Sequence, residues 1–166
     1  MDAMSLDAFG RLYNSPLEAG IRAVIVLEHL RPVTADLPEM VLFDHVVVHS
    51  HDHGGPPSLH TKLPARKGEL LVRRRLVERS LQLMRGCHLV AEMHGADGIS
   101  YRATDEAAAY VELLESPYSE HLKFCASWIR DEVRQHTKDG FKERLRRRIG
   151  EWTDAFGVVD GPIRQA

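Results

Sequence analysis

The sequence contains only two cysteines and no apolar run that approaches the ~20 residues of a membrane-spanning helix. Two cysteines are too few for the disulfide framework of a small secreted domain. Cys87 and Cys125 each lie within an apolar segment, and we expect both to be reduced thiols in the core. The first residues, MDAM, carry neither the basic start nor the apolar stretch of a signal peptide, so we expect a cytoplasmic protein without a membrane segment.

An excess of charge of one sign is also missing. Lysine and arginine total 22 residues against 24 aspartates and glutamates, which gives a net charge of −2. The protein as a whole therefore does not attract nucleic acid or an anionic membrane, and any contact with DNA requires a local basic patch. With 166 residues, of which 43% are hydrophobic, the chain is long enough for one domain with an appendage and a sizeable core.

Signatures of catalysis are few. Gly54 and Gly55 are not followed by the lysine that a phosphate-binding loop needs, and residues 95–98 (GADG) are more typical of a turn between strands. Cys125 lies at the inward spacing of a helical stripe, which favours a core thiol over a nucleophile. We therefore expect a protein that has no catalytic activity of its own and needs no cofactor.

Capping patterns predict two helices in the first part of the chain. Ser15, Pro16 and Glu18 form a capping box with proline at the first helical position, which predicts a helix from 15 to about 30. Asp36 and Glu39 repeat the capping pattern and predict a helix over 37–47, with a strand over 43–48 as the alternative. Residues 49–60 (HSHDHGGPPSLH) contain too much glycine and proline to continue either element, and predict a structured loop.

The next part of the chain predicts a helix followed by a hairpin. A long helix over 65–85 has an apolar half made of Leu70, Val72, Leu76, Val77, Leu81, Leu83 and Met84. Short apolar runs over 89–93 and 99–103, on either side of the glycine-rich turn, predict two strands, and Thr104 begins an alanine-rich helix. A hairpin directly after a basic helix is the second half of a winged helix.

Two more helices are predicted near the end of the chain, over 118–135 and 140–156. The last has an apolar stripe that is either core or a site for a partner helix, made of Phe141, Leu145, Ile149, Trp152 and Phe156. We therefore predict an α+β fold that is mostly helical, with a winged-helix core and additional C-terminal helices. The predicted parts are a flexible N-terminal segment (1–13), a winged-helix-like domain (14–116), a C-terminal helical extension (117–157) and a tail (158–166).

A histidine cluster is the main suggestion of enzymatic chemistry. His49, His51 and His53, with Asp52, resemble the His-x-His-x-Asp-His loop of metallo-β-lactamase-like hydrolases, in which imidazoles on a loop bind zinc. The match is one residue short, because Asp52 follows His51 directly. That hydrolase fold also needs ligands from several strands, which a helix-rich chain does not provide. We therefore predict no metal site and keep zinc-dependent hydrolysis as a minor alternative.

The helix over 65–85 carries the candidate basic surface. It occupies the place of the recognition helix in a winged helix, where arginines reach phosphates or guanine edges. A face of this kind can equally be solvated or pair with acidic side chains of a partner protein. The candidate residues are Arg73, Arg74, Arg75, Arg79 and Arg85, with Arg102 on the hairpin.

Five segments together carry a resemblance to a known family: 14–22 (NSPLEAGIR), 44–50 (DHVVVHS), 54–60 (GGPPSLH), 71–76 (LVRRRL) and 98–104 (GISYRAT). The chain resembles the middle components of bacterial ABC-three-component systems over most of residues 13–135. These small proteins are encoded between an ABC ATPase of the SMC/Rad50 kind and an effector component, and Lamassu antiphage systems are one branch.

The resemblance implies a non-enzymatic adaptor that bridges the ATPase to an effector, with contact to DNA made directly or through the complex. It also points to the 50–60 loop as a rigid docking surface, or as a packing element beneath the hairpin. The loop residues concerned are Ser50, Gly54, Gly55, Pro56, Pro57, Ser58, Leu59 and His60. The main rival is a free-standing winged-helix transcription factor, which would bind DNA as a homodimer.

Overall fold

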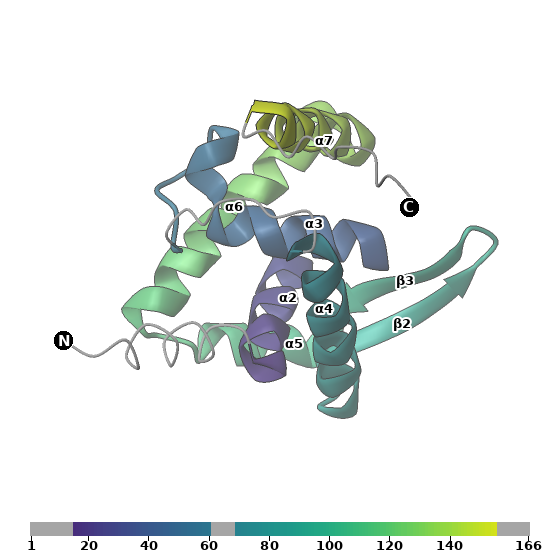
Figure 1. The fold of residues 1–166 in the computed structure, drawn as a ribbon. Coiled ribbons are helices and arrows are strands. Elements are labelled where there is room, and N and C mark those ends of the chain that lie inside the picture. The colour runs from purple at the N-terminus through teal and green to yellow at the C-terminus, as the bar shows by residue number, and fades with distance from the viewer. Residues whose placement is uncertain (1–14, 61–68, 156–166) are drawn as a thin grey trace, which may run out of the picture.

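The computed structural model describes residues 15–60 and 69–155, and side chains over 15–60 and 72–150. The first described range contains α2 (Pro16–Leu30), β1 (Ala35–Asp36), α3 (Leu37–Val48) and the 3-10 helix η1 (Ser50–His53). The second contains α4 (Glu69–Gly86), β2 (Val90–Gly95), β3 (Gly98–Ala103), α5 (Asp105–Glu112), α6 (Pro117–His136) and α7 (Lys138–Ala155) (Figure 1). The predicted class, a mostly helical α+β protein, is confirmed. None of the described helices is both long enough and apolar enough to cross a membrane.

The predicted capping residues begin the first two helices. Ser15 Oγ accepts a hydrogen bond from the Glu18 backbone N–H (3.2 Å) at the start of α2. Asp36 and Glu39 form a reciprocal capping box at the start of α3, with both bonds at 2.8 Å. The alternative strand over 43–48 is wrong. α3 is buried on nearly every side, so packing outweighs the weak helix propensity of its β-branched run.

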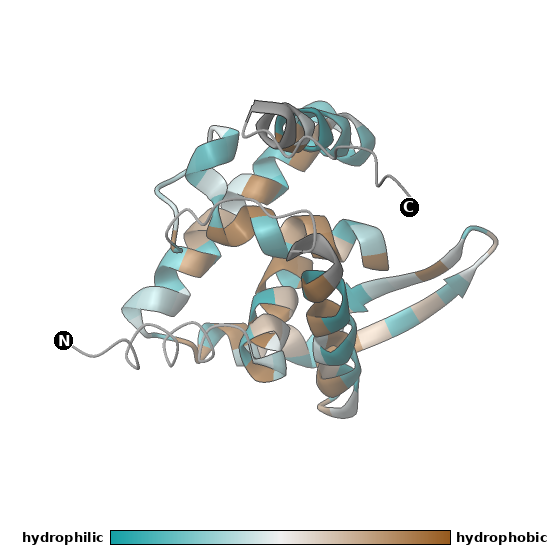
Figure 2. Ribbon diagram, in the orientation of Figure 1, coloured by the Kyte–Doolittle hydropathy of each residue, from teal (hydrophilic) through white to brown (hydrophobic). Residues whose placement is uncertain are grey.

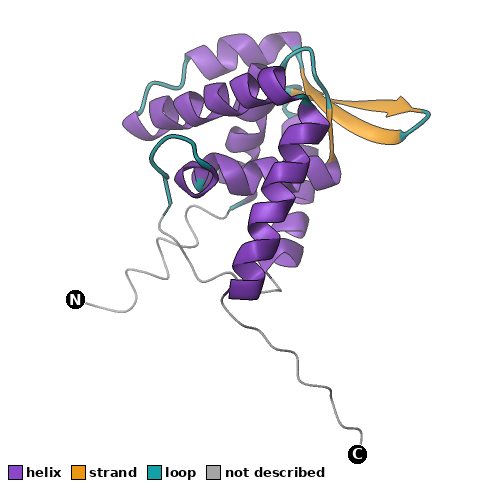
Figure 3. Cartoon of the chain, turned by 90° about the horizontal axis from the view of Figure 1, so that it is seen from above, coloured by secondary structure: helices purple, strands orange, loops and turns teal. Residues whose placement is uncertain are grey.

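The sheet has three strands in the order β1, β3, β2, and both pairings are antiparallel. Val90 pairs with Ala103 at the base of the hairpin, and Gly95 pairs with Gly98 at its tip. Gly98 has a φ of 109°, which explains the need for glycine at the turn. The hairpin projects beyond the helices in both views (Figures 1 and 3). The helix, strand, helix, helix, strand, strand order suits a winged helix, and that finer assignment stays a prediction.

The core runs through the middle of the molecule, around α2 (Figure 2). α2 and α4 approach closely, since a Cβ on Gly20 would lie 2.5 Å from Met84 Cε. α6 and α7 share the same core with the residues before 117, as Leu122, Cys125, Ile129, Phe141 and Leu145 are all buried. Phe141 stacks on Phe43 with ring centroids 6.4 Å apart, so the beginning of the apolar stripe of α7 is core. Trp152 and Phe156 lie outside the described side chains.

Several sequence predictions about burial are wrong. Cys87 is exposed because it follows the end of α4, although Cys125 is buried as expected. Val72 and Leu83 are 71% and 40% exposed, because the buried stripe of α4 is narrower than half of the helix. It consists of Val77, Ser80, Leu81 and Met84, at the i, i+3, i+4, i+7 spacing of one face. The predicted segments 1–13 and 158–166, and the predicted helix over 65–68, lie outside the described residues.

We expect Phe141→Ala to lower the free energy of unfolding by about 3–5 kcal/mol, because it leaves a cavity between α7, α3 and α6. Phe124→Ala is the matched control. Phe124 lies on α6 and is 59% exposed, so its removal should cost less than about 0.5 kcal/mol. Urea unfolding followed by circular dichroism measures both. Equal effects of the two substitutions would show that α7 is not part of the cooperative core.

Candidate functional site

A buried carboxylate joins three helices near the middle of the molecule. Asp44 on α3 accepts hydrogen bonds from Arg22 on α2 (Nε to Oδ1, 2.7 Å) and Arg73 on α4 (Nη1 to Oδ2, 2.5 Å). Burial alone would raise the pKa of Asp44, but the two guanidinium charges outweigh it and hold the pKa below its usual value. The sequence does contain a sign of this ion pair, because Arg22 and Asp44 are charged residues within apolar runs. A buried charge needs a partner, but the sequence alone does not show which residues pair.

A second buried carboxylate on α3 holds the start of α7. Glu39 accepts from Lys138 Nζ (3.0 Å) and Lys142 Nζ (2.6 Å), in addition to its capping bond. Desolvation opposes ionisation of Glu39, but the hydrogen bonds from Lys142, the Asp36 backbone and Lys138 lower its pKa overall. The positions of α4 and α7 relative to α3 are therefore both fixed by ion pairs.

Four histidines form a packed row beside the Asp44 ion pairs. The ring of His45 lies 4.9 Å from that of His49 and 5.6 Å from that of His53, and His49 lies 6.1 Å from His60. Burial is the main cause that lowers their pKa values, to about 3 for His45 and about 4 for His53 and His60. The pKa of His49 is lowered as well, for the same reason. The row is therefore neutral near neutral pH.

The three histidines of the alternative zinc site are not brought together. His49 and His53 belong to the packed row, whereas His51 is exposed and its backbone N–H donates to Ser58 Oγ (3.1 Å). Among the residues that the structure describes, no group of three or more histidine, cysteine, aspartate or glutamate side chains is placed to hold a metal ion. The histidines that do come together, His45, His49 and His53, are four residues apart in the sequence. α3 is followed almost directly by η1, which keeps these side chains on the same side.

The 50–60 loop is fixed against α6. Ser50 Oγ donates to Pro56 O (3.0 Å) and lies 3.4 Å from Cys125 Sγ, and His121 Nε2 lies 2.8 Å from Pro57 O. A Cβ on Gly55 would meet the Trp128 ring at 2.8 Å, so the loop needs glycine there. At its end, His60 Nε2 lies 3.0 Å from Tyr118 Oη.

These contacts hold the loop, but several of its predicted contact residues face inward. Ser50 is fully buried, and Gly55, Pro56, Ser58, Leu59 and His60 are half-buried. Gly54, with a φ of 82°, and Pro57 are exposed. The loop packs against α6 rather than beneath the hairpin. Partner binding through its exposed residues stays a prediction.

The predicted basic surface is split by the structure. Arg73 faces inward to Asp44, and Arg85 pairs with Glu92 on β2, so these two are not free to contact a partner. Arg74, Arg75 and Arg79 on α4 are exposed, as is Arg102 on β3. Periodicity alone could not separate Arg73 from its neighbours, because its partner Asp44 lies on another helix.

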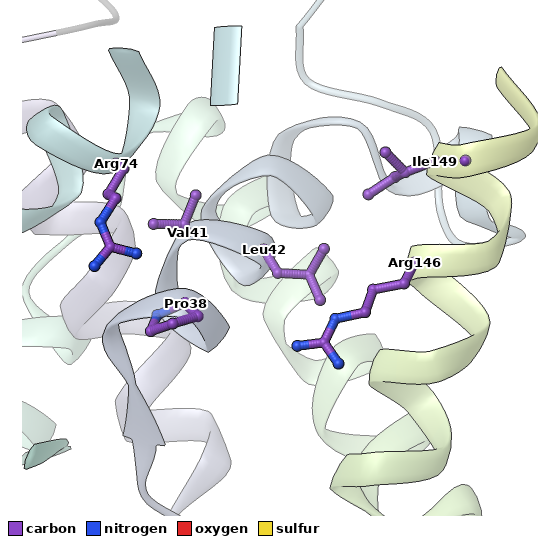
Figure 4. A pocket seen from close by; sticks show the side chains of 7 residues that line it. Pro38, Val41, Leu42, Arg74, Arg146 and Ile149 are labelled. Carbon is purple, nitrogen blue, oxygen red and sulfur yellow. The ribbon is translucent and has the colours of Figure 1, made fainter. Parts of the chain in front are cut away.

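An apolar hollow of about 470 Å³ opens beside this surface, between α3, α4 and α7. Figure 4 shows Arg74 reaching from α4 and Arg146 from α7, with residues of α3 between them. The lining residues are Pro38, Val41, Leu42, Arg74, Arg146, Ile149 and Gly150. The hollow could not be predicted from the sequence, because its lining residues come from three segments that are far apart in the chain.

One comparison with known proteins identifies a family. The model of the family "ABC-three component (ABC-3C) system Middle Component 2" matches residues 12–155. The match extends beyond residue 135, where the sequence resemblance was expected to end, and includes α7. No curated protein and no solved structure matches the chain.

Asp44→Asn should destabilise the protein by about 3–5 kcal/mol, because it leaves two guanidinium groups without their buried counter-charge. Asp97→Asn is the control, since Asp97 is exposed in the hairpin turn, and should change the stability by less than about 0.5 kcal/mol. Chemical denaturation measures both. A loss of stability no greater for Asp44→Asn than for Asp97→Asn would mean that the ion pairs do not hold the helices together.

The histidine row predicts a loss of stability in mild acid. Unfolded histidines take up protons near pH 6.5, but the folded row does so only near the lowered pKa values. Between those limits the unfolded state binds more protons, so the free energy of unfolding falls as the pH is lowered, by up to about 1.4 kcal/mol per pH unit for each histidine. Urea midpoints at several pH values measure the slope, which His53→Gln should reduce. Parallel curves for this variant and the original chain would rule out a contribution from His53.

Proposed function

The chain belongs to the family of middle component 2 of ABC-three-component systems, and on this basis we propose that it is a non-catalytic adaptor subunit of such a system. The family match over residues 12–155 carries this proposal. It is supported by the absence of a recognisable nucleophile or phosphate-loop motif in the sequence. The two buried carboxylates, Asp44 and Glu39, also fit a structural role, because their ion pairs hold helices together.

We further propose that the adaptor bridges an SMC/Rad50-like ABC ATPase to an effector component, as in Lamassu-type defence. Bridging requires two separate surfaces, and the structure offers two candidates. The projecting hairpin exposes Met93 and Ile99, which are apolar residues of the kind that protein interfaces bury. The hollow with Arg74 and Arg146 lies between α3, α4 and α7, away from the hairpin tip (Figures 1 and 4).

We also propose that α2 to β3 form a winged helix in which α4 takes the place of a recognition helix. This placement favours the rival function, a DNA-binding regulator, through the exposed Arg74, Arg75 and Arg79. Two observations favour protein contact instead. Arg73 and Arg85 are held by carboxylates of this chain, and Arg74 borders an apolar hollow.

Co-expression of the tagged full chain with the products of the adjacent genes, followed by affinity purification and mass measurement, tests the adaptor function. We expect a stable complex that contains an ABC ATPase and a second component, and that survives nuclease treatment. Recovery of the chain alone, as a homodimer that binds duplex DNA with an affinity falling steeply with salt, would favour the transcription factor and reject the adaptor.

A further inference from the structure

Resting on the proposed adaptor function, we propose that the hollow between α3, α4 and α7 is the docking site for an acidic amphipathic segment of a second protein. The segment would seat apolar side chains on Val41, Leu42 and Ile149, and place carboxylates on Arg74 and Arg146. An apolar floor beside two arginines that have no carboxylate partner among the described side chains indicates the chemistry of the occupant.

The floor of the hollow is made of α3, the helix that is buried on nearly every other side. Val41 and Leu42 contribute its apolar surface, with Pro38 at one end and Ile149 on the wall formed by α7 (Figure 4). At about 470 Å³ the hollow is about three times the size of an apolar cavity that binds benzene (~150 Å³). It therefore has room for more than one apolar side chain of a partner.

The walls carry positive charge that the described side chains do not neutralise. Over the described side chains, neither Arg74 nor Arg146 has a carboxylate within salt-bridge distance. Several other basic residues on the same two helices do have one. The pairs are Arg73 with Asp44, Arg85 with Glu92, Lys142 with Glu39 and Arg144 with Glu132. Carboxylates from a partner would pair with Arg74 and Arg146 by charge-assisted hydrogen bonds.

Nucleic acid fits this site less well than protein. Phosphates would satisfy Arg74 and Arg146, but the DNA backbone has no apolar side chain to cover Val41 and Leu42. A purely apolar ligand would leave the two arginines in a partly desolvated site without counter-charge. An acidic amphipathic segment satisfies both requirements, since its carboxylates flank its apolar residues.

The test uses the full chain, co-expressed with the products of the adjacent genes, in two double variants of equal charge. Arg74→Glu with Arg146→Glu alters the walls of the hollow. Arg75→Glu with Arg147→Glu is the matched control, since Arg75 and Arg147 are exposed neighbours on the same helices and do not line the hollow. All four residues are exposed, and thermal unfolding of each purified variant checks that it folds.

We expect the Arg74/Arg146 variant to lower the recovery of one partner at least about tenfold. The Arg75/Arg147 variant should retain it within about twofold. Milder Arg74→Ala with Arg146→Ala should give an intermediate loss. Nuclease treatment should change none of these results.

Several outcomes would overturn the proposal. If the Arg74/Arg146 variant recovers its partners like the original chain, the hollow is not the docking site, while the adaptor function stands. Equal losses in both double variants, or loss on nuclease treatment, would point to nucleic acid or to non-specific attraction. If the chain purified alone is a dimer that Arg74→Glu with Arg146→Glu dissociates, a second copy occupies the hollow. If the original chain recovers no partner, both proposals fail.

Discussion

The pairing of Asp44 with Arg22 and Arg73 is the constraint on which the rest of the structure depends. A carboxylate buried in a helix that has hardly any exposed face must be neutralised by its neighbours, and the neighbours available are α2 and α4. Glu39, one and a half turns earlier, applies the same requirement to α7 through Lys138 and Lys142. α3 thus fixes both walls of the hollow by charge, and supplies its floor by apolar side chains.

The local structure could be predicted well from the sequence, because it depends on residues close together in the chain. Ser15 and Asp36 begin their helices with the expected hydrogen bonds, and Gly98 marks the turn of the hairpin. The predicted helix ends at about 30, 47, 118 and 135 agree with the observed ends at 30, 48, 117 and 136 to within the usual uncertainty of such boundaries.

Contacts between distant elements could not be predicted in the same way. Arg73 and Arg74 are adjacent in a run of three arginines, and only the position of Asp44 decides which of them is buried. The histidine row could not be predicted from the sequence for a related reason. The pattern 49, 51, 53 is typical of a metal-binding loop, but α3 runs on into η1, and helical spacing brings His45, His49 and His53 together instead.

The opposite orientations of Arg73 and Arg74 have a consequence for how such a protein can evolve. Arg73 is required by the interior, whereas Arg74 and Arg146 are exposed and have no carboxylate partner among the described side chains. Substitutions at 74 and 146 can therefore accumulate without threatening the fold, and under the docking proposed above each new charge pattern there would select a different complementary surface. Related systems that coexist in one cell could in this way keep their subunits from exchanging, while the framework of α2, α3 and α4 stays the same.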